Sequence, residues 1–307
     1  IFGKEDLKKN YSFFYLLKIL FKNILFYKGS LLKIYHSCSL WSHFAKIVLK
    51  EVMSIVKKNK FLNIILPYEA QPFQNTIFSE IRKENKNIKL IGYLHSTQPF
   101  PSFQIYRSGA PDVLLVHSEC QIFHLNKYLN WPKSKLQLIP SLRYKKDDRI
   151  NFNCKIVLPY TLSFEKILLK QFDDFLGSAE KKAFFPLFIK NHPFKLESKQ
   201  HKRFIINIKK IILKYEDRFS EKLGKKVSIF FGGTSSILLA LENGSNIMHI
   251  CKDAVLESFT EALWPAIKVK QINEYIFEYN LSSYGKCVNF DSSYGGEFEK
   301  YCNLQSN

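Results

Sequence analysis

Arginine is scarce in this chain. Only six of its 46 basic residues are arginine, and the other 40 are lysine. Proteins that hold phosphates or read bases with two parallel hydrogen bonds favour the planar guanidinium of arginine. The formal net charge of +19 therefore indicates a surface suited to anionic lipid or to anionic substrates, and nucleic acid is not an expected partner.

Metal and disulfide motifs are also lacking. The cysteines show no CxxC or Cys/His spacing, and no Asp-x-Asp motif follows a predicted strand. Isolated cysteines in apolar runs are typical of reduced, buried thiols in a cytoplasmic protein. We therefore expect no metal site, no cofactor and no disulfide framework. The six cysteines are Cys38, Cys120, Cys154, Cys251, Cys287 and Cys302.

No apolar run reaches the roughly 20 residues that a membrane-spanning helix needs. The most apolar segment, residues 11–27, is interrupted by Lys18 and Lys22, which share one helical face. This segment is either a basic amphipathic helix on the membrane surface or a helix packed on a sheet. We expect a cytoplasmic protein with peripheral contact at the inner face of the cytoplasmic membrane.

What the chain does contain is an alternation of short apolar runs and amphipathic segments. Strands are predicted at 61–66, 88–93, 112–116, 136–139, 155–158, 187–190, 227–231, 246–251 and 266–270. Helices are predicted at 39–58, 75–86, 119–129, 164–176, 202–215, 237–243 and 256–264. Strands alternating with helices at this spacing are typical of α/β proteins, with parallel sheets covered by helices on both faces.

The charged run 145–149 interrupts this alternation. We place a domain boundary there, which gives two Rossmann-like doubly wound domains, 1–148 and 149–307. Ligands of such domains bind at the carboxyl ends of the strands, so we expect a cleft there between the domains. Because the chain begins with Ile, we expect the first domain to lack part of its N-terminus.

Two predicted strands of the first domain end in polar residues. Glu69 follows the strand at 61–66 in the run Tyr68-Glu69-Ala70-Gln71, and His95 follows the strand at 88–93. A carboxylate at such a rim is suited to deprotonate an acceptor hydroxyl, and a histidine to orient a substrate or assist proton transfer. A surface glutamate and a structural histidine would have the same sequence, and the residues alone leave both interpretations open.

In the second domain the stretch 229–241, IFFGGTSSILLAL, predicts a buried strand, a tight turn and a helix. Gly232 and Gly233 permit a sharp turn. Thr234, Ser235 and Ser236 are N-cap types, and the helix is expected to stop at Gly244. A helix N-terminus with hydroxyls is suited to bind an anion, most often a phosphate. An ordinary capped strand–turn–helix joint is the alternative.

The run Lys190-Asn191-His192-Pro193 ends the preceding predicted strand, about 40 residues before the serines. A histidine at a strand end, held by a following proline of fixed φ, is suited to donate to a phosphate. We expect the His192 and Ser235 loops to lie on adjacent strands and to bind one phosphate from two sides.

These motifs resemble those of bacterial surface-carbohydrate glycosyltransferases, of the O-antigen and capsule type. KNHP at 190–193 and GGTSS at 232–236 are similar to the two donor motifs of GT-B enzymes that use CMP-activated sugars, such as sialyl and Kdo transferases. YEAQPF at 68–73 and IGYLHST at 91–97 resemble the N-terminal half of such proteins, except that Ala70 stands where glycine is usual. The resemblance covers residues 61–252.

The resemblance implies a GT-B-like transferase that moves a sugar, an acidic one, from a CMP-activated donor to a surface-polysaccharide or lipid-linked acceptor. It implies Glu69 as the general base, with His95 beside it. The donor nucleotide site would comprise His192, Pro193, Gly233, Thr234, Ser235 and Ser236, with Gln71 and Lys190 as further pocket residues.

Two alternatives stay open. CDP-polyol phosphotransferases of the teichoic-acid type share the HP and Ser-Ser features. A non-catalytic basic protein that binds a membrane surface would have the same charge.

Overall fold

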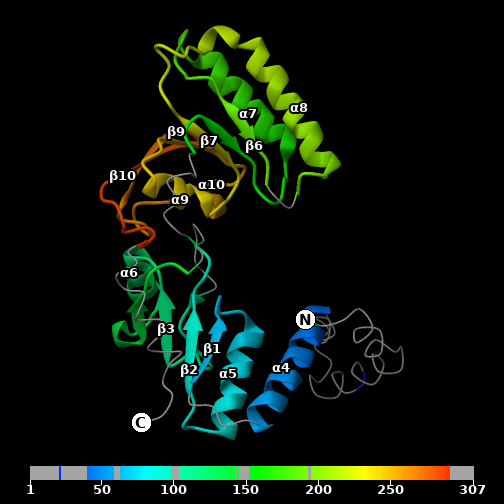
Figure 1. The fold of residues 1–307 in the computed structure, drawn as a ribbon, viewed down its shortest axis with the longest axis vertical. Helices are drawn as coiled ribbons and strands as arrows, with labels where there is room; N and C mark the ends of the chain where they lie inside the picture. Colours follow the sequence, from blue (N-terminus) through cyan, green and yellow to red (C-terminus); the bar gives the residue numbers. More distant parts are fainter. Residues whose placement is uncertain are drawn as a thin grey trace. The chain divides into compact units, whose positions relative to one another are not determined.

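The computed structural model describes residues 21, 40–58, 63–97, 104–142, 144, 152–192 and 195–290. The protein is α/β, with helices alternating with the strands of two sheets (Figure 1). The chain divides into two compact units. The smaller comprises Ile1–Ile64, Ala70–Leu90 and Arg107–Pro111, and the larger comprises Ile65–Glu69, Ile91–Tyr106 and Asp112–Asn307.

The smaller unit is built on two helices that pack side by side, α4 (Leu40–Lys58) and α5 (Pro72–Glu84) (Figure 1). Helix α4 matches the predicted span. Helix α5 begins three residues before its predicted start, because a proline in the first turn loses no helical hydrogen bond. The buried face of α5 includes Ile77, Phe78 and Ile81.

The first sheet has the order β1 (Asn63–Pro67), β2 (Lys89–Tyr93), β3 (Val113–Val116) and β4 (Leu136–Leu138). Strands β2, β3 and β4 are parallel, as predicted. Their buried contacts join Ile91, Leu115 and Ile139. A single 3₁₀ turn, Lys133–Lys135, leads into β4.

Helix α6 (Glu119–Tyr128) begins where its capping pattern predicts. The Ser118 hydroxyl accepts a hydrogen bond from the Gln121 amide at 3.2 Å. The return bond differs from the standard capping box, because the Gln121 side chain accepts from the His117 amide, at 3.1 Å, and not from Ser118. Gln121 therefore fixes the segment that leaves β3.

The second sheet has the order β6-β5-β7-β8-β10-β9. The first four strands in this order are parallel, and β10 runs antiparallel to both β8 and β9. The sequence predicts the strand β9 but not the hairpin that it forms with β10. The six strands are β5 (Lys155–Val157), β6 (Phe188–Lys190), β7 (Ser228–Phe231), β8 (Ile247–Ile250), β9 (Ile267–Asn273) and β10 (Ile276–Leu281).

Helices cover both faces of the second sheet, as predicted (Figure 1). On one face α7 (Glu165–Ser178) and α8 (Lys199–Lys214) bury Phe172 and Phe204 against Phe231. On the other, the short helix α9 (Ser236–Glu242) packs over Phe230 and Ile247. A 3₁₀ turn, Glu216–Arg218, follows α8.

The helix predicted at 256–264 is wrong. Only one turn forms, α10 (Ala254–Glu257), capped by the Asp253 carboxylate, which accepts from the Val255 and Leu256 amides. The chain then leaves the helical path because the Phe259 amide donates to the Tyr279 hydroxyl at 3.1 Å. This bond to β10 and the burial of Phe259 replace the helical continuation.

The segment after β10 is hydrogen-bonded to a buried carboxylate at the end of α9. Glu242 accepts hydrogen bonds from the amides of Gly285 at 2.5 Å, Cys287 at 2.8 Å and Val288 at 3.1 Å. Burial raises the pKa of Glu242, although these three donors oppose that rise. The loop is therefore anchored by one side chain.

The same loop also binds the start of α6. The Lys286 carbonyl accepts from the Ser118 hydroxyl at 2.8 Å and from the Cys120 amide at 3.2 Å. Three residues on, the Asn289 amide donates to the His117 carbonyl at 2.7 Å. We call residues 282–289 the strap, because they bond both α9 and the segment that follows β3.

Several predictions fall outside the described residues. The amphipathic segment 11–27, of which only Phe21 is described, and the proposed boundary at 145–149 lie there, so the division into domains 1–148 and 149–307 stays a prediction. None of the helices in the described ranges is long and apolar enough to cross a membrane. The four described cysteines are free thiols and buried, which confirms the burial expected for them.

Candidate active site

Glu69 and His95 meet at the ends of β1 and β2. The ladder continues past β1, since the amide of the buried Tyr68 donates to the Tyr93 carbonyl at 2.8 Å. Glu69 is the next residue, and its Oε1 lies 3.4 Å from His95 Nε2. The side chains are 22% and 38% exposed, respectively, so the pair is partly shielded but open to a ligand.

Three polar atoms beside this pair are buried and lack a hydrogen-bond partner among the described residues. They are Nδ1 of His95, Oγ of Ser96 and Oγ1 of Thr97. Buried polar atoms are nearly always hydrogen-bonded, so a group of three is unusual.

The third strand adds a residue that the sequence analysis missed. His117 follows β3 directly and is fully buried, and its ring lies edge-to-face against Tyr144 at 5.8 Å. The signal was available, since His117 follows a buried strand just as Glu69 and His95 do.

Tyr144 connects the end of the first sheet to the serine loop. Its amide donates to the Ser141 hydroxyl at 2.8 Å, and its own hydroxyl donates to Ser235 Oγ at 2.7 Å. Ser235 thus accepts a bond within the protein and keeps its hydroxyl proton for another acceptor. Tyr144 could not be identified from the sequence, because this contact joins residues 91 positions apart.

The glycine turn before Ser235 has the sharp geometry predicted for it. Gly232 has φ of +64°, and its amide donates to the Ile250 carbonyl at 2.8 Å. Its carbonyl accepts from Nε2 of His249 at 2.9 Å. His249 is fully buried, and burial lowers its pKa to about 4. A neutral imidazole therefore holds the turn in place.

Helix α9 ends at Glu242, and Gly244, the predicted stop, has φ of +78° two residues later. It has only seven residues, so its dipole is short. Ser235, at the N-cap, makes no side-chain capping bond, and the Ser236 amide donates to Thr234 Oγ1 at 3.3 Å. In the described part of the chain, the amides of Gly233, Thr234 and Ser235 make no hydrogen bond. An anion at this point would therefore be bound by the serine and threonine hydroxyls and by the amides of the turn, rather than by the helix dipole.

His192 follows β6 directly and lies beside Asn191 and Tyr160. Its amide donates to Asn191 Oδ1 at 2.8 Å, and its ring edge packs on Tyr160 at 5.2 Å. Burial first, and then the charges of His201 and Lys195, lower the pKa of His192. The next residue, Pro193, lies outside the described residues.

The expectation that the His192 and Ser235 loops lie on adjacent strands is wrong. Strand β5 lies between β6 and β7, so the two loops leave the same edge two strands apart, roughly 10 Å at the usual strand spacing. Pro159 and Tyr160, which follow β5, fill the interval. Tyr160 contacts His192, and a Cβ at Gly232 would meet Pro159 at 3.4 Å.

Two further predicted pocket residues have structural contacts. Gln71 is the N-cap of α5, and its amide donates to Gln74 Oε1 at 3.0 Å. Lys190 is the last residue of β6, with its ammonium 4.5 Å from the Phe152 ring centroid. Burial, and secondarily Lys155, lowers the pKa of Lys190. Pocket roles for both stay predictions.

Ala70 adopts a left-handed backbone conformation, which favours glycine. Its φ is +57°, and its carbonyl accepts from the side chains of Arg107 and Asn75. Ala70→Gly is expected to change the free energy of unfolding by less than about 0.5 kcal/mol, because relief of left-handed strain, about 1 kcal/mol, offsets a lost buried methyl of about 0.8 kcal/mol.

Ala70→Val is the matched test of that conformation. A β-branched side chain in the same left-handed region, at a fully buried site, is expected to lower stability by at least about 2 kcal/mol. Urea unfolding of both variants measures this. A valine variant as stable as the native chain would contradict the assignment of φ at Ala70.

Among the described residues, no group of three or more His, Cys, Asp or Glu side chains is placed to hold a metal ion. Comparisons of the chain with protein-family models, with curated proteins and with solved structures found no match.

Proposed function

We propose that this protein is a GT-B-type glycosyltransferase that moves a sugar, an acidic one, from a CMP-activated donor to a surface-polysaccharide or lipid-linked acceptor. The observation that supports this best is the Glu69–His95 pair, 3.4 Å apart at the ends of two strands, beside three polar atoms that have no hydrogen-bond partner among the described residues. Such a site is suited to bind a polyhydroxyl acceptor and to remove a proton from it. Two Rossmann-like domains that face a cleft belong to the same proposal.

Glu69 is the general base of the proposed reaction, and His95 orients it by donating Nε2–H to its carboxylate. The acceptor hydroxyl loses its proton to Glu69 as its oxygen bonds to the anomeric carbon of the donor sugar. The bond from that carbon to the phosphate oxygen breaks, and CMP leaves with the electron pair. Because the leaving phosphate is already anionic, stabilisation of its charge matters more than protonation.

The donor phosphate is assigned to the Gly233–Ser235 turn. Ser235 can donate its proton to the phosphate because Tyr144 supplies the bond to its oxygen. The turn amides add donors at the same point. His192, which leaves the same edge of the sheet two strands away, is assigned to the far side of the same phosphate.

Thermal-shift measurements with CMP, CDP, UDP and GDP test the proposal. CMP at 100 times its dissociation constant would stabilise the fold by about 2.7 kcal/mol. Hydrolysis of a CMP-sugar, compared with CDP-glycerol, separates sugar transfer from polyol-phosphate transfer. If neither CMP nor CDP stabilises the fold, the proposal is contradicted and a non-catalytic surface protein is favoured.

CMP affinity is expected to rise as the pH falls from 8 towards 6, through His192. Its pKa is lowered in the free protein, and a bound phosphate favours the imidazolium, so binding takes up a proton. The affinity gain is limited to about tenfold per pH unit. Isothermal titration should show weaker binding and a flat pH profile in His192→Ala.

Cytidine is the matched control ligand for this measurement, because it lacks the phosphate. Its affinity should not vary with pH over the same range. If His192→Ala keeps both the native affinity for CMP and its pH dependence, His192 is not part of the donor site.

A further inference from the structure

The outer face of α8 is strongly basic. This helix of 16 residues contains no aspartate or glutamate. Its buried face is formed by His201, Phe204 and Ile208, which leaves every basic side chain exposed. The basic residues are Lys199, Lys202, Arg203, Lys209, Lys210 and Lys214.

Two aliphatic side chains stand among these charges. Ile206 is 54% exposed and Leu213 is 70% exposed. Residues seven apart on a helix share a face, and Lys202 and Lys209 complete the stripe. A solvated helix face gains nothing from exposed isoleucine and leucine, whereas a face that meets an apolar layer does.

Acidic side chains around α8 neutralise part of the charge. Lys202 pairs with Glu197 at 2.7 Å, and Lys214 with Asp173 at 2.9 Å. In the described part of the chain, the other three lysines, Lys199, Lys209 and Lys210, make no ion pair. The face therefore keeps an excess of positive charge.

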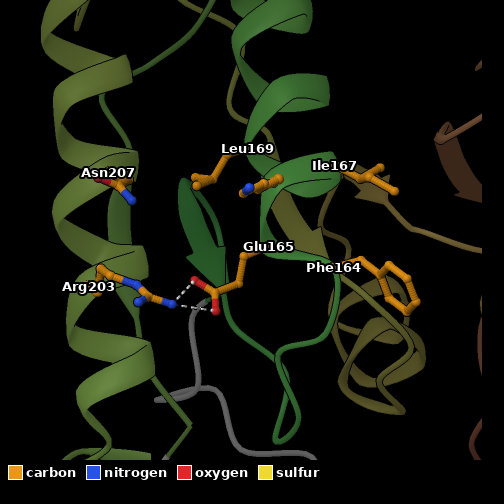
Figure 2. Close-up of a pocket in the computed structure, with 7 residues that line it drawn as sticks. Phe164, Glu165, Ile167, Leu169, Arg203 and Asn207 are labelled. Carbon is orange, nitrogen blue, oxygen red and sulfur yellow. Dashed lines mark hydrogen bonds and ion pairs between the residues drawn. The ribbon is translucent and has the colours of Figure 1, made fainter.

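A hollow of about 580 Å³ lies between α7 and α8 next to this face. Figure 2 shows Arg203 of α8 reaching across to Glu165 of α7, an ion pair of 3.1 Å. Ile167, Leu169 and Phe164 line the hollow with carbon, and the Phe164 ring is also contacted by the Lys252 ammonium, 4.5 Å from its centroid. The hollow is thus mostly apolar with a charged pair across it.

We propose that this outer face of α8, with the adjoining hollow, docks on an anionic lipid bilayer. The lysines attract anionic headgroups, and Ile206 and Leu213 enter the boundary with the acyl chains. Nucleic acid fits this face less well. Arg203, the only arginine of α8, is paired with Glu165, and the exposed aliphatic side chains would find no apolar partner on a phosphate backbone. The proposal does not depend on the glycosyltransferase activity.

Co-sedimentation of the full chain with vesicles tests the proposal. Vesicles of phosphatidylglycerol and phosphatidylcholine in equal parts should bind the chain, and vesicles of phosphatidylcholine alone should not. Changing Lys199, Lys209 and Lys210 to glutamine should lower the partition coefficient by roughly 100-fold, about fivefold for each lysine. Adding Ile206→Ser and Leu213→Ser to this variant should lower the partition coefficient further. The remaining binding should still depend on the salt concentration.

The matched control removes the same charge elsewhere, at Lys222, Lys268 and Lys270, which are also exposed. This variant should lose no more than about twofold in partition, since its lysines lie on a loop and on β9. Equal losses in both triple variants would overturn the proposal and show only a net-charge effect. It would also be overturned if α8 variants lose single-stranded RNA binding while vesicle binding is unchanged.

Circular dichroism of each variant checks that the fold is intact, because glutamine at exposed helical positions has nearly the helix propensity of lysine.

Discussion

Glu69→Gln should lower the rate of sugar transfer by about 10³-fold, because glutamine cannot accept the acceptor proton. The substitution keeps the shape of the side chain, and the glutamine carbonyl oxygen is able to accept from His95 Nε2–H. CMP affinity should stay within about twofold of the native value, since the donor contacts are assigned to other residues. The measurement is release of CMP under single-turnover conditions, with CMP affinity determined separately by titration.

Glu221→Gln is the matched control for this variant, because Glu221 is exposed on a loop and no ion pair of it is present in the described residues. It should transfer at the native rate. His95→Asn should give a smaller loss than Glu69→Gln, about tenfold, since His95 only orients the base. Full activity of Glu69→Gln would remove Glu69 from the reaction, whatever the nucleotide measurements show.

Lowering the pH from 7 to 4 should reduce the free energy of unfolding by about 6 kcal/mol through His124 and His249. Burial lowers the pKa of each to about 4 in the folded protein, against about 6.5 in the unfolded chain. Below pH 6.5 the unfolded state binds more protons than the folded state, so stability falls until about pH 4. Each histidine contributes about 3 kcal/mol.

Urea unfolding at intervals of half a pH unit measures this loss. His124→Gln and His249→Gln should each remove about half of the pH dependence, while lowering stability at pH 7. For His249→Gln the loss at pH 7 includes the bonds to Gly232 and Tyr279. A slope below pH 6.5 that is unchanged in both variants would contradict the buried, neutral state of these histidines.

Local signals in the sequence predicted local structure well. The Ser118 cap, the turn at Gly232 and the stop at Gly244 each depend on residues within a few positions, and each is present. The predicted helix at 256–264 fails for the opposite reason. Its end is decided by the bond from Phe259 to Tyr279, a residue 20 positions away on a strand that the sequence analysis did not identify.

Strand β10 was missed because it is antiparallel to both of its neighbours, β8 and β9, whereas the other pairs in the sheet are parallel. The alternation of strands and helices predicts parallel pairs of strands. It does not predict an antiparallel hairpin, in which a two-residue turn folds β10 back on β9. The order of strands has the same limit. Nothing in the spacing between His192 and Ser235 reveals that β5 lies between their strands.

The candidate site was predictable residue by residue but not as a set of contacts. Glu69 and His95 were identified because each follows a buried strand, and the structure places them 3.4 Å apart. His117 has the same position after β3 and was overlooked. Tyr144 could not have been found, since its bond to Ser235 joins segments that only the fold brings together.

The contacts between the strap and the start of α6 can form only late in synthesis of the chain. Lys286, whose carbonyl receives the Ser118 hydroxyl, leaves the ribosome 168 residues later than Ser118. At usual rates of translation that interval is on the order of ten to thirty seconds. Throughout it the nascent chain presents the first turn of α6 and the His117 carbonyl without these partners. The emerging polypeptide is thus open to chaperone capture at this point until Lys286 and Asn289 have emerged.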